Sequence, residues 1–154
     1  MNETNPPVNG QATTVKKLFS RTTTVTIDIA ASPETVWMLL TDVSTFKSWN
    51  STVVDFTGKI ALGEKIQLRS TLAPDRIFKL KVKEFEPPQR LSWGDAMGTR
   101  VYTLVRNSDD GTQFTMSEKI GGPVFPLFAK MIPPFDESFN QFASDLKTAA
   151  EKQV

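Results

Sequence analysis

One carboxylate in the second half of the chain, Asp95, follows Leu91 and Trp93 at every second position. Side chains two residues apart in a β-strand point to the same face of the sheet, so an inward-pointing Trp93 predicts an inward-pointing Asp95. A carboxylate in an apolar cavity needs a partner, or its pKa is raised. Arg100 stands just beyond the turn over residues 96–99 and can supply that partner, within a binding site or as an ion pair at its rim.

Glu118 is a second carboxylate that is predicted to point inward, because it shares its spacing with Phe114 and Met116. A buried carboxylate beside a keto substrate can act as a general base for enolisation, although the end of a strand is also open to water. The single tyrosine, Tyr102, alternates with Leu104, and its hydroxyl can bind a ligand carbonyl or a backbone group. Apolar residues occupy both faces of this strand, which leaves the orientation of Tyr102 open.

Histidine and cysteine are both absent from the 154 residues. Their absence excludes zinc sites built on imidazole or thiolate, Ser-His-Asp triads, cysteine nucleophiles and disulfides. Any catalysis would depend on carboxylates, lysines, arginines, Tyr102 or bound water, and no catalytic residue is assigned. We expect neither a metal ion nor a cofactor.

The composition is typical of one globular domain, with 39% hydrophobic residues. The 18 Lys and Arg residues nearly balance the 17 Asp and Glu residues, and no basic block exceeds Lys16-Lys17. The sequence therefore lacks the clustered basic residues that a nucleic-acid-binding protein usually has, and no nucleic-acid partner is expected. No stretch approaches the ~20 consecutive apolar residues of a membrane span, and the N-terminal residues lack the apolar core of a signal peptide. A cytoplasmic location is expected.

The elements that position these residues follow a distinctive order. Residues 1–15 are polar and predict a disordered leader ahead of a single domain over residues 16–154. A half-buried strand begins at Thr24. The sequence Ser32-Pro33-Glu34 then predicts a helix, with a hydroxyl cap, a proline at the first position and a carboxylate near the positive end. A second short helix is expected from Ser44.

Six strands joined by tight turns follow the two helices. We expect them over residues 52–57, 65–72, 78–83, 90–95, 100–106 and 112–120. Lysines at every second position of the third of these strands predict a solvated convex face. Beyond Pro133-Pro134, apolar residues recur at helical spacing and predict a long C-terminal helix of about four turns. The segment before these prolines, with Phe128 and Met131, is expected to form the mouth of a pocket or a hinge.

Short motifs along residues 23–152 resemble the START-like (SRPBCC) superfamily of polyketide cyclases, lipid-transfer domains and plant pollen allergens. The resemblance implies an α+β helix-grip fold, in which a seven-stranded antiparallel sheet wraps around the C-terminal helix and two short helices follow the first strand. The motifs are Ile27-x-Ile29-x-Ala31-Ser32-Pro33-Glu34-x-Val36-Trp37, Phe46-x-x-Trp49, Gly58, Gly63, Glu86-Pro87, Leu91-x-Trp93, Gly111-Thr112 and Glu118.

The predicted function is binding of a hydrophobic small molecule, a lipid, quinone, sterol or polyketide-like compound, in an internal cavity, as a carrier or sensor. The alternative is an enzyme of the polyketide cyclase or dehydrase type that acts on an aromatic or poly-keto substrate. A module that binds a protein partner through an exposed apolar patch is a third possibility. The absence of His and Cys favours binding without catalysis.

The predicted ligand-binding residues come from the three strands nearest the C-terminus, the pocket mouth and the last helix. Phenylalanines of that helix can line the cavity or simply pack in the core. The predicted set is Trp93, Asp95, Arg100, Tyr102, Phe114, Met116, Glu118, Phe128, Met131, Phe135, Phe139 and Phe142.

Overall fold

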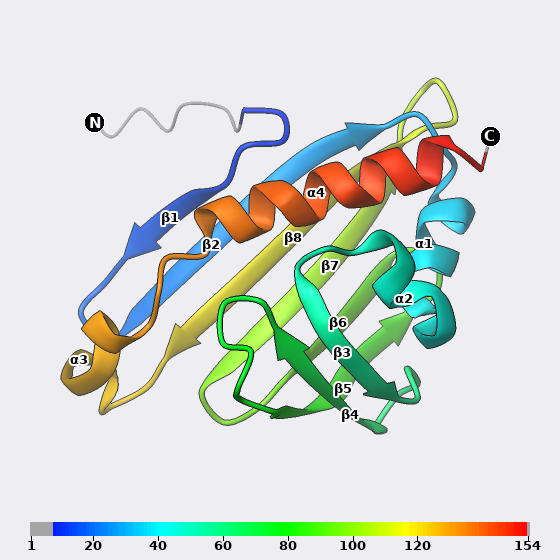
Figure 1. Cartoon of the computed structure of the whole chain (residues 1–154). Coiled ribbons are helices and arrows are strands. Elements are labelled where there is room, and N and C mark those ends of the chain that lie inside the picture. Colours follow the sequence, from blue (N-terminus) through cyan, green and yellow to red (C-terminus); the bar gives the residue numbers. More distant parts are fainter. Residues whose placement is uncertain (1–7, 154) are drawn as a thin grey trace.

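The computed structural model describes residues 8–153 as an α+β fold in which one antiparallel sheet grips a long C-terminal helix (Figure 1). The sheet has the strand order β1-β2-β8-β7-β6-β5-β4-β3. The strands are β1 (Thr13–Lys16), β2 (Ser20–Ile29), β3 (Val53–Gly58), β4 (Lys65–Ser70), β5 (Phe78–Glu86), β6 (Arg90–Gly94), β7 (Gly98–Arg106) and β8 (Thr112–Gly121). The helices are α1 (Pro33–Thr41), α2 (Val43–Trp49), α3 (Phe125–Phe128), the 3-10 helix η1 (Ala129–Met131) and α4 (Asp136–Glu151). The predicted helix-grip fold is confirmed.

The two short helices begin where local side chains satisfy their first N–H groups. The hydroxyl of Ser32 accepts a hydrogen bond from the backbone N–H of Thr35, and Pro33 occupies the first turn of α1. Asp42 ends α1 and caps α2, with its carboxylate accepting from Ser44. This cap places the start of α2 one residue before the predicted Ser44.

Helix α4 lies across the sheet and supplies one side of the core (Figure 1). Phe139, Phe142 and Leu146 are buried on one stripe, as their helical spacing predicted. The helix packs directly against β2, whose alternate residues Val25 and Ile27 are also buried. None of the helices within residues 8–153 combines the length and apolar character that crossing a membrane requires.

The sheet has eight strands where seven were expected, because β1 pairs antiparallel with β2. The predicted disordered leader over residues 1–15 is therefore wrong for residues 13–15, while residues 1–7 lie outside the described residues. Polar contacts hold this edge strand: Thr14 bonds to Thr23 at 2.9 Å, and the backbone N–H of Ala12 donates to Asn140 of α4. Such contacts leave no apolar period in the sequence.

The half of the sheet formed by β3 to β5 is bent. The register shifts between Val53 and Asp55 in β3 and between Val82 and Glu84 in β5. A β-bulge of this kind bends its strand and increases the local twist. Lys79, the first lysine of the predicted wet face, is exposed. The bend carries the inner face of these strands away from α4 and leaves space between them.

Candidate functional site

A cavity of about 350 Å³ lies between α4 and the bent half of the sheet. Its walls are mainly apolar and come from α2, from β3 to β8 and from the segment of residues 131–142, which includes the first half of α4. The apolar side chains that line it include Phe46, Val53, Phe56, Leu68, Phe78, Leu80, Trp93, Ile120, Phe135 and Phe142. The cavity is thus an apolar space that is separate from the packed core under the rest of α4.

Three cavity residues form a row across neighbouring strands. Trp93 of β6 stands opposite Arg100 of β7, which in turn stands opposite Glu118 of β8. The Nε of Arg100 donates a hydrogen bond of 2.9 Å to Oε1 of Glu118. Only 23% of the Arg100 side chain and 18% of the Glu118 side chain are exposed. Glu118 therefore faces the cavity, the orientation that its spacing predicted, and its carboxylate is paired there with the guanidinium of Arg100.

The guanidinium of Arg100 is held on two sides. Its central carbon lies 5.0 Å from the ring centroid of Phe139 on α4, within the range of a cation–π contact. Burial alone would lower the pKa of Arg100, but Glu118 and Tyr102 oppose this and raise it above its ordinary value. Arg100 therefore carries its charge at any physiological pH.

Tyr102 faces the cavity, which decides the orientation that the sequence left open. Its ring packs at 5.0 Å from that of Trp93 and at 5.8 Å from that of Phe142. Burial raises the pKa of Tyr102 to about 12, although Arg100 acts in the opposite direction. Its phenol is protonated at neutral pH and can donate a hydrogen bond.

Asp95 stands at the rim of the cavity, and the predicted pairing with Arg100 is wrong. Its carboxylate accepts hydrogen bonds from the backbone N–H groups of Met97 at 2.8 Å and Gly98 at 3.0 Å. Strand β6 ends at Gly94, so the alternation that placed Asp95 inward stops one residue earlier. The exposed Asp95 stabilises the turn between β6 and β7.

The cavity contacts only part of the predicted ligand-binding set. Trp93, Asp95, Arg100, Tyr102, Glu118, Met131, Phe135 and Phe142 line it. The remaining predicted residues lie elsewhere, which corrects their assignment to the cavity wall. Phe114 and Met116 are fully buried in the core, Phe139 lies against Phe135 and Arg100, and Phe128 packs on Phe125 outside the cavity. Ligand contact by any of these residues stays a prediction.

Residues from the bent strands complete the wall and were not predicted. Phe56, Leu68, Phe78 and Leu80 come from β3, β4 and β5. A signal for two of them was present, because Phe78 and Leu80 alternate with exposed lysines. The polar groups Thr52, Ser70, Arg76 and Ser138 also reach the wall. Among residues 8–153, no group of three or more Asp, Glu, His or Cys residues is arranged to hold a metal ion.

Sequence comparison matches residues 20–151 to the family described as polyketide cyclase / dehydrase and lipid transport. The chain belongs to this family. The matched region begins with β2, so β1 and the β1–β2 turn precede it. A search of curated proteins found no match.

Solved structures with the same fold come from several bacteria. A conserved protein of unknown function from Enterococcus faecalis aligns with a TM-score of 0.68 at 16% identity, over 92% of this chain and 78% of its own. A protein from Mesorhizobium loti aligns with a TM-score of 0.68 at 22% identity, over 87% and 99%. A START superfamily protein from Mycobacterium smegmatis aligns with a TM-score of 0.64 at 16% identity, over 86% and 99%. At these identities the likeness establishes the fold.

Proposed function

We propose that this member of the polyketide cyclase / dehydrase and lipid transport family binds a hydrophobic small molecule in the cavity, as a carrier or sensor. The observation that carries the proposal is a cavity of about 350 Å³ whose apolar wall is interrupted by the Arg100–Glu118 pair. Ligand sites commonly measure ~300 to 1,000 Å³ and combine apolar walls with a few placed polar groups. Lipids, quinones, sterols and polyketide-like compounds share this chemistry.

The polar groups of the cavity favour a neutral polar end on the ligand. Arg100 has further N–H donors beyond the one that Glu118 accepts, and the protonated Tyr102 lies two residues along the same strand face. A ligand carbonyl or hydroxyl can accept from these donors without disturbing the ion pair. A ligand carboxylate would compete with Glu118 for Arg100 and would face its negative charge. Ketones, quinones and sterols therefore fit better than fatty acids.

An enzyme of the cyclase or dehydrase type is the second candidate. It is supported by the presence of Arg100, Tyr102 and Glu118 on one cavity wall, where a carboxylate base and two donors would face a poly-keto substrate. Against it, the Oε1 of Glu118 already accepts from Arg100. Binding without catalysis needs no rearrangement of this pair and is preferred.

Ligand binding is tested by native mass spectrometry of the protein from its own source, combined with titration of a probe panel. The panel contains a quinone, a sterol, an aromatic polyketide and a fatty acid. We expect saturable binding of at least one of the first three and weaker binding of the fatty acid. If no probe binds and no ligand is retained, the proposal fails.

The enzyme candidate has a separate test. The protein and its Glu118→Gln variant are incubated with a linear poly-keto substrate, and cyclised or dehydrated products are separated by chromatography. Product that forms with the wild type and is lost in E118Q would favour the enzyme. Tight binding with no product from either protein would favour the carrier.

A further inference from the structure

An exposed apolar surface adjoins the mouth of the cavity. It consists of the turn Lys16–Phe19 and the segment Val124–Met131, and we call these two segments the basic tip. Leu127 is 83% exposed and Met131 is 82% exposed, the highest fractions among the large apolar side chains of residues 8–153. Leu18 and Phe19 are 70% and 54% exposed. Such side chains gathered at one place commonly mark an interaction site.

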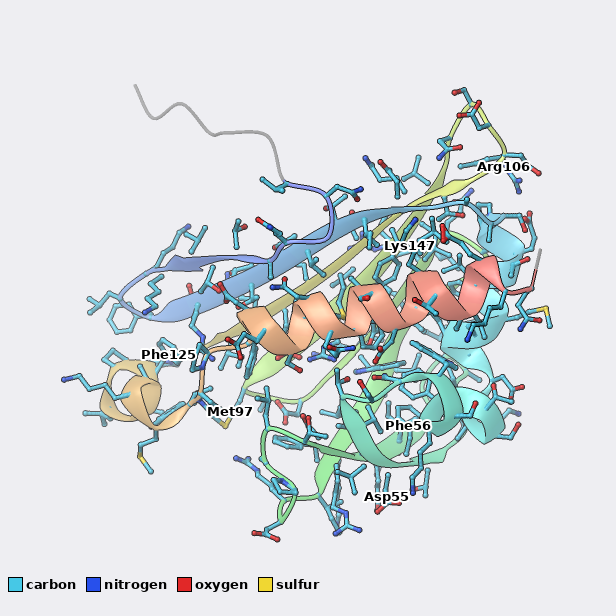
Figure 2. All side chains as sticks on the ribbon, turned by 45° about the horizontal axis from the view of Figure 1, so that its top comes forward. Asp55, Phe56, Met97, Arg106, Phe125 and Lys147 are labelled. Carbon is cyan, nitrogen blue, oxygen red and sulfur yellow. The ribbon has the colours of Figure 1, made fainter. Side chains whose placement is uncertain are left out.

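The two segments lie side by side although more than 100 residues separate them in the sequence. The backbone N–H of Gly122 donates to the carbonyl of Phe19 at 3.0 Å. Arg21 donates to the carbonyls of Ile132 and Pro133 at 3.2 and 2.8 Å and so ties the chain after η1 to β2. The β1–β2 turn adjoins α3 at one end of the molecule (Figure 1), and Figure 2 shows Phe125 and Met97 at this same end.

A buried residue anchors the tip while its neighbours stay exposed. Phe125 is only 3% exposed and packs against Phe128 with ring centroids 5.7 Å apart. Leu127, next to this pair, points its side chain to solvent. The exposure of Leu127 and Met131 therefore belongs to a fixed backbone rather than to a loose end.

The charge of the basic tip has one sign. Lys16, Lys17 and Lys130 are exposed, and neither segment contains Asp or Glu. No ion pair found within residues 8–153 involves these lysines. The whole chain has a net charge of only +1, so this end is more cationic than the average surface. Asp95 at the nearby rim is occupied with capping its own turn.

We propose that the basic tip docks on an anionic lipid membrane surface. Exposed Leu and Met side chains enter the boundary between headgroups and acyl chains, and lysines around them pair with anionic headgroups while their alkyl stems stay in the apolar layer. The exposed side chains come from a turn, the four-residue α3 and the three-residue η1. A lipid surface accepts such short projections without shape complementarity, whereas a protein partner would need a matching pocket.

The docked orientation would place the cavity mouth against the lipid. Met131 both lines the cavity and belongs to the tip, so it stands where an apolar ligand would pass. Docking itself does not depend on a ligand, whereas ligand exchange with the membrane rests on the proposed function. The turn Lys16–Phe19 also precedes the family match over residues 20–151, so this half of the tip lies outside the region that the family shares.

Co-sedimentation of the full chain with vesicles tests the docking. Vesicles of phosphatidylcholine alone are compared with vesicles that also contain phosphatidylglycerol, at low and high salt. We expect binding to the anionic vesicles that weakens with salt, and about a fivefold loss of the partition coefficient for each lysine charge removed in Lys17→Gln and Lys130→Gln. Leu127→Ser is expected to reduce partitioning about tenfold.

Met38→Ser is the matched control, because Met38 is a 69% exposed apolar residue of α1 and lies outside the tip. It is expected to partition like the wild type, and thermal melting verifies that every variant is folded. The proposal is overturned if the wild type ignores anionic vesicles, or if L127S and M38S partition equally. Sedimentation velocity without vesicles tests whether a second copy of the chain binds the basic tip instead. Dimerisation that L127S abolishes would assign the tip to that second copy and overturn the membrane proposal. Probe binding by the same variants in vesicle-free buffer reports on the cavity separately.

Discussion

Arg100 and Glu118 form an ion pair between neighbouring strands β7 and β8, with Nε and Oε1 2.9 Å apart on the wall of the cavity. The pair is mostly shielded from water, so the loss of one partner would leave the other partly desolvated without its counter-charge. This relationship allows the first test of how the site is built.

The variant Arg100→Met is expected to lower the free energy of unfolding by about 1–3 kcal/mol, since Glu118 then loses its charged donor. Glu118→Gln should cost less, because the amide oxygen can still accept from Arg100. The double variant R100M/E118Q should lose less than the sum of the single losses. Urea unfolding curves measure all three, and an R100M curve identical to that of the wild type would contradict the role assigned to the pair.

Tyr102 allows a pH test because it is the only tyrosine in the chain. Its pKa of about 12 in the folded protein exceeds the ordinary value of 10, so the unfolded state loses this proton first as the pH rises. Stability from this group is complete below pH 10 and is lost between about pH 10 and 12, at up to about 1.4 kcal/mol per pH unit. Ultraviolet titration of the phenolate gives the folded pKa directly.

Tyr102→Phe is the control for this pH dependence. This variant lacks the phenol, so its free energy of unfolding should fall less over the same pH range, because only the other titrating groups contribute. A phenolate that appears near pH 10 in the native protein would show that Tyr102 is hydrated rather than buried in the cavity wall.

Asp95 is expected to act on the turn and not on a ligand. Asp95→Ala removes the acceptor of the Met97 and Gly98 N–H groups and should cost about 1 kcal/mol of stability. The affinity for any probe that binds the cavity should stay unchanged. Urea unfolding and a probe titration on the same variant separate the two effects. A large loss of affinity with no loss of stability would mean that Asp95 contacts the ligand instead.

Ser138 offers a way to fill the cavity from α4. The variant Ser138→Phe adds a ring to the cavity wall and should lower probe affinity about tenfold or more, because it takes up volume that the ligand needs. Ser144→Phe makes the same change at an exposed position of the same helix and should leave the affinity unchanged. Fluorescence titration of both variants is the measurement. Equal affinities would mean that ligands bind somewhere other than this cavity.

The prediction of Asp95 illustrates how far a local pattern reaches. Period-two alternation places a side chain correctly only while the strand continues, and it held through Phe114, Met116 and Glu118 within β8. It failed at Asp95 because β6 ends at Gly94, where a Cβ would lie 2.2 Å from the carbonyl oxygen of Gly98. The end of a strand depends on such contacts across a turn, and residue types alone do not reveal them.

Strand β1, which makes the sheet eight-stranded, was not predicted for a related reason. Thr13–Lys16 is an exposed edge strand that carries no buried apolar stripe. Its position depends on hydrogen bonds to Thr23 and, through Ala12, to α4. A strand that is held by polar contacts with distant residues leaves no periodic signal in its own sequence.

The sequence by itself determined the order of the elements from β2 to α4, because strand and helix periods, the Ser32 cap and turn residues are local properties, and its motifs resemble a superfamily with the helix-grip fold. Only the tertiary structure decided where the cavity lies. Helix α4 packs against β2 and covers Phe114 directly, whereas the bulged strands β3 and β5 bend away and expose Phe78 to the space beneath the helix. Both phenylalanines point inward with the same local pattern. What separates a core residue from a cavity residue is the distance to the opposite layer, which depends on the curvature of the whole sheet.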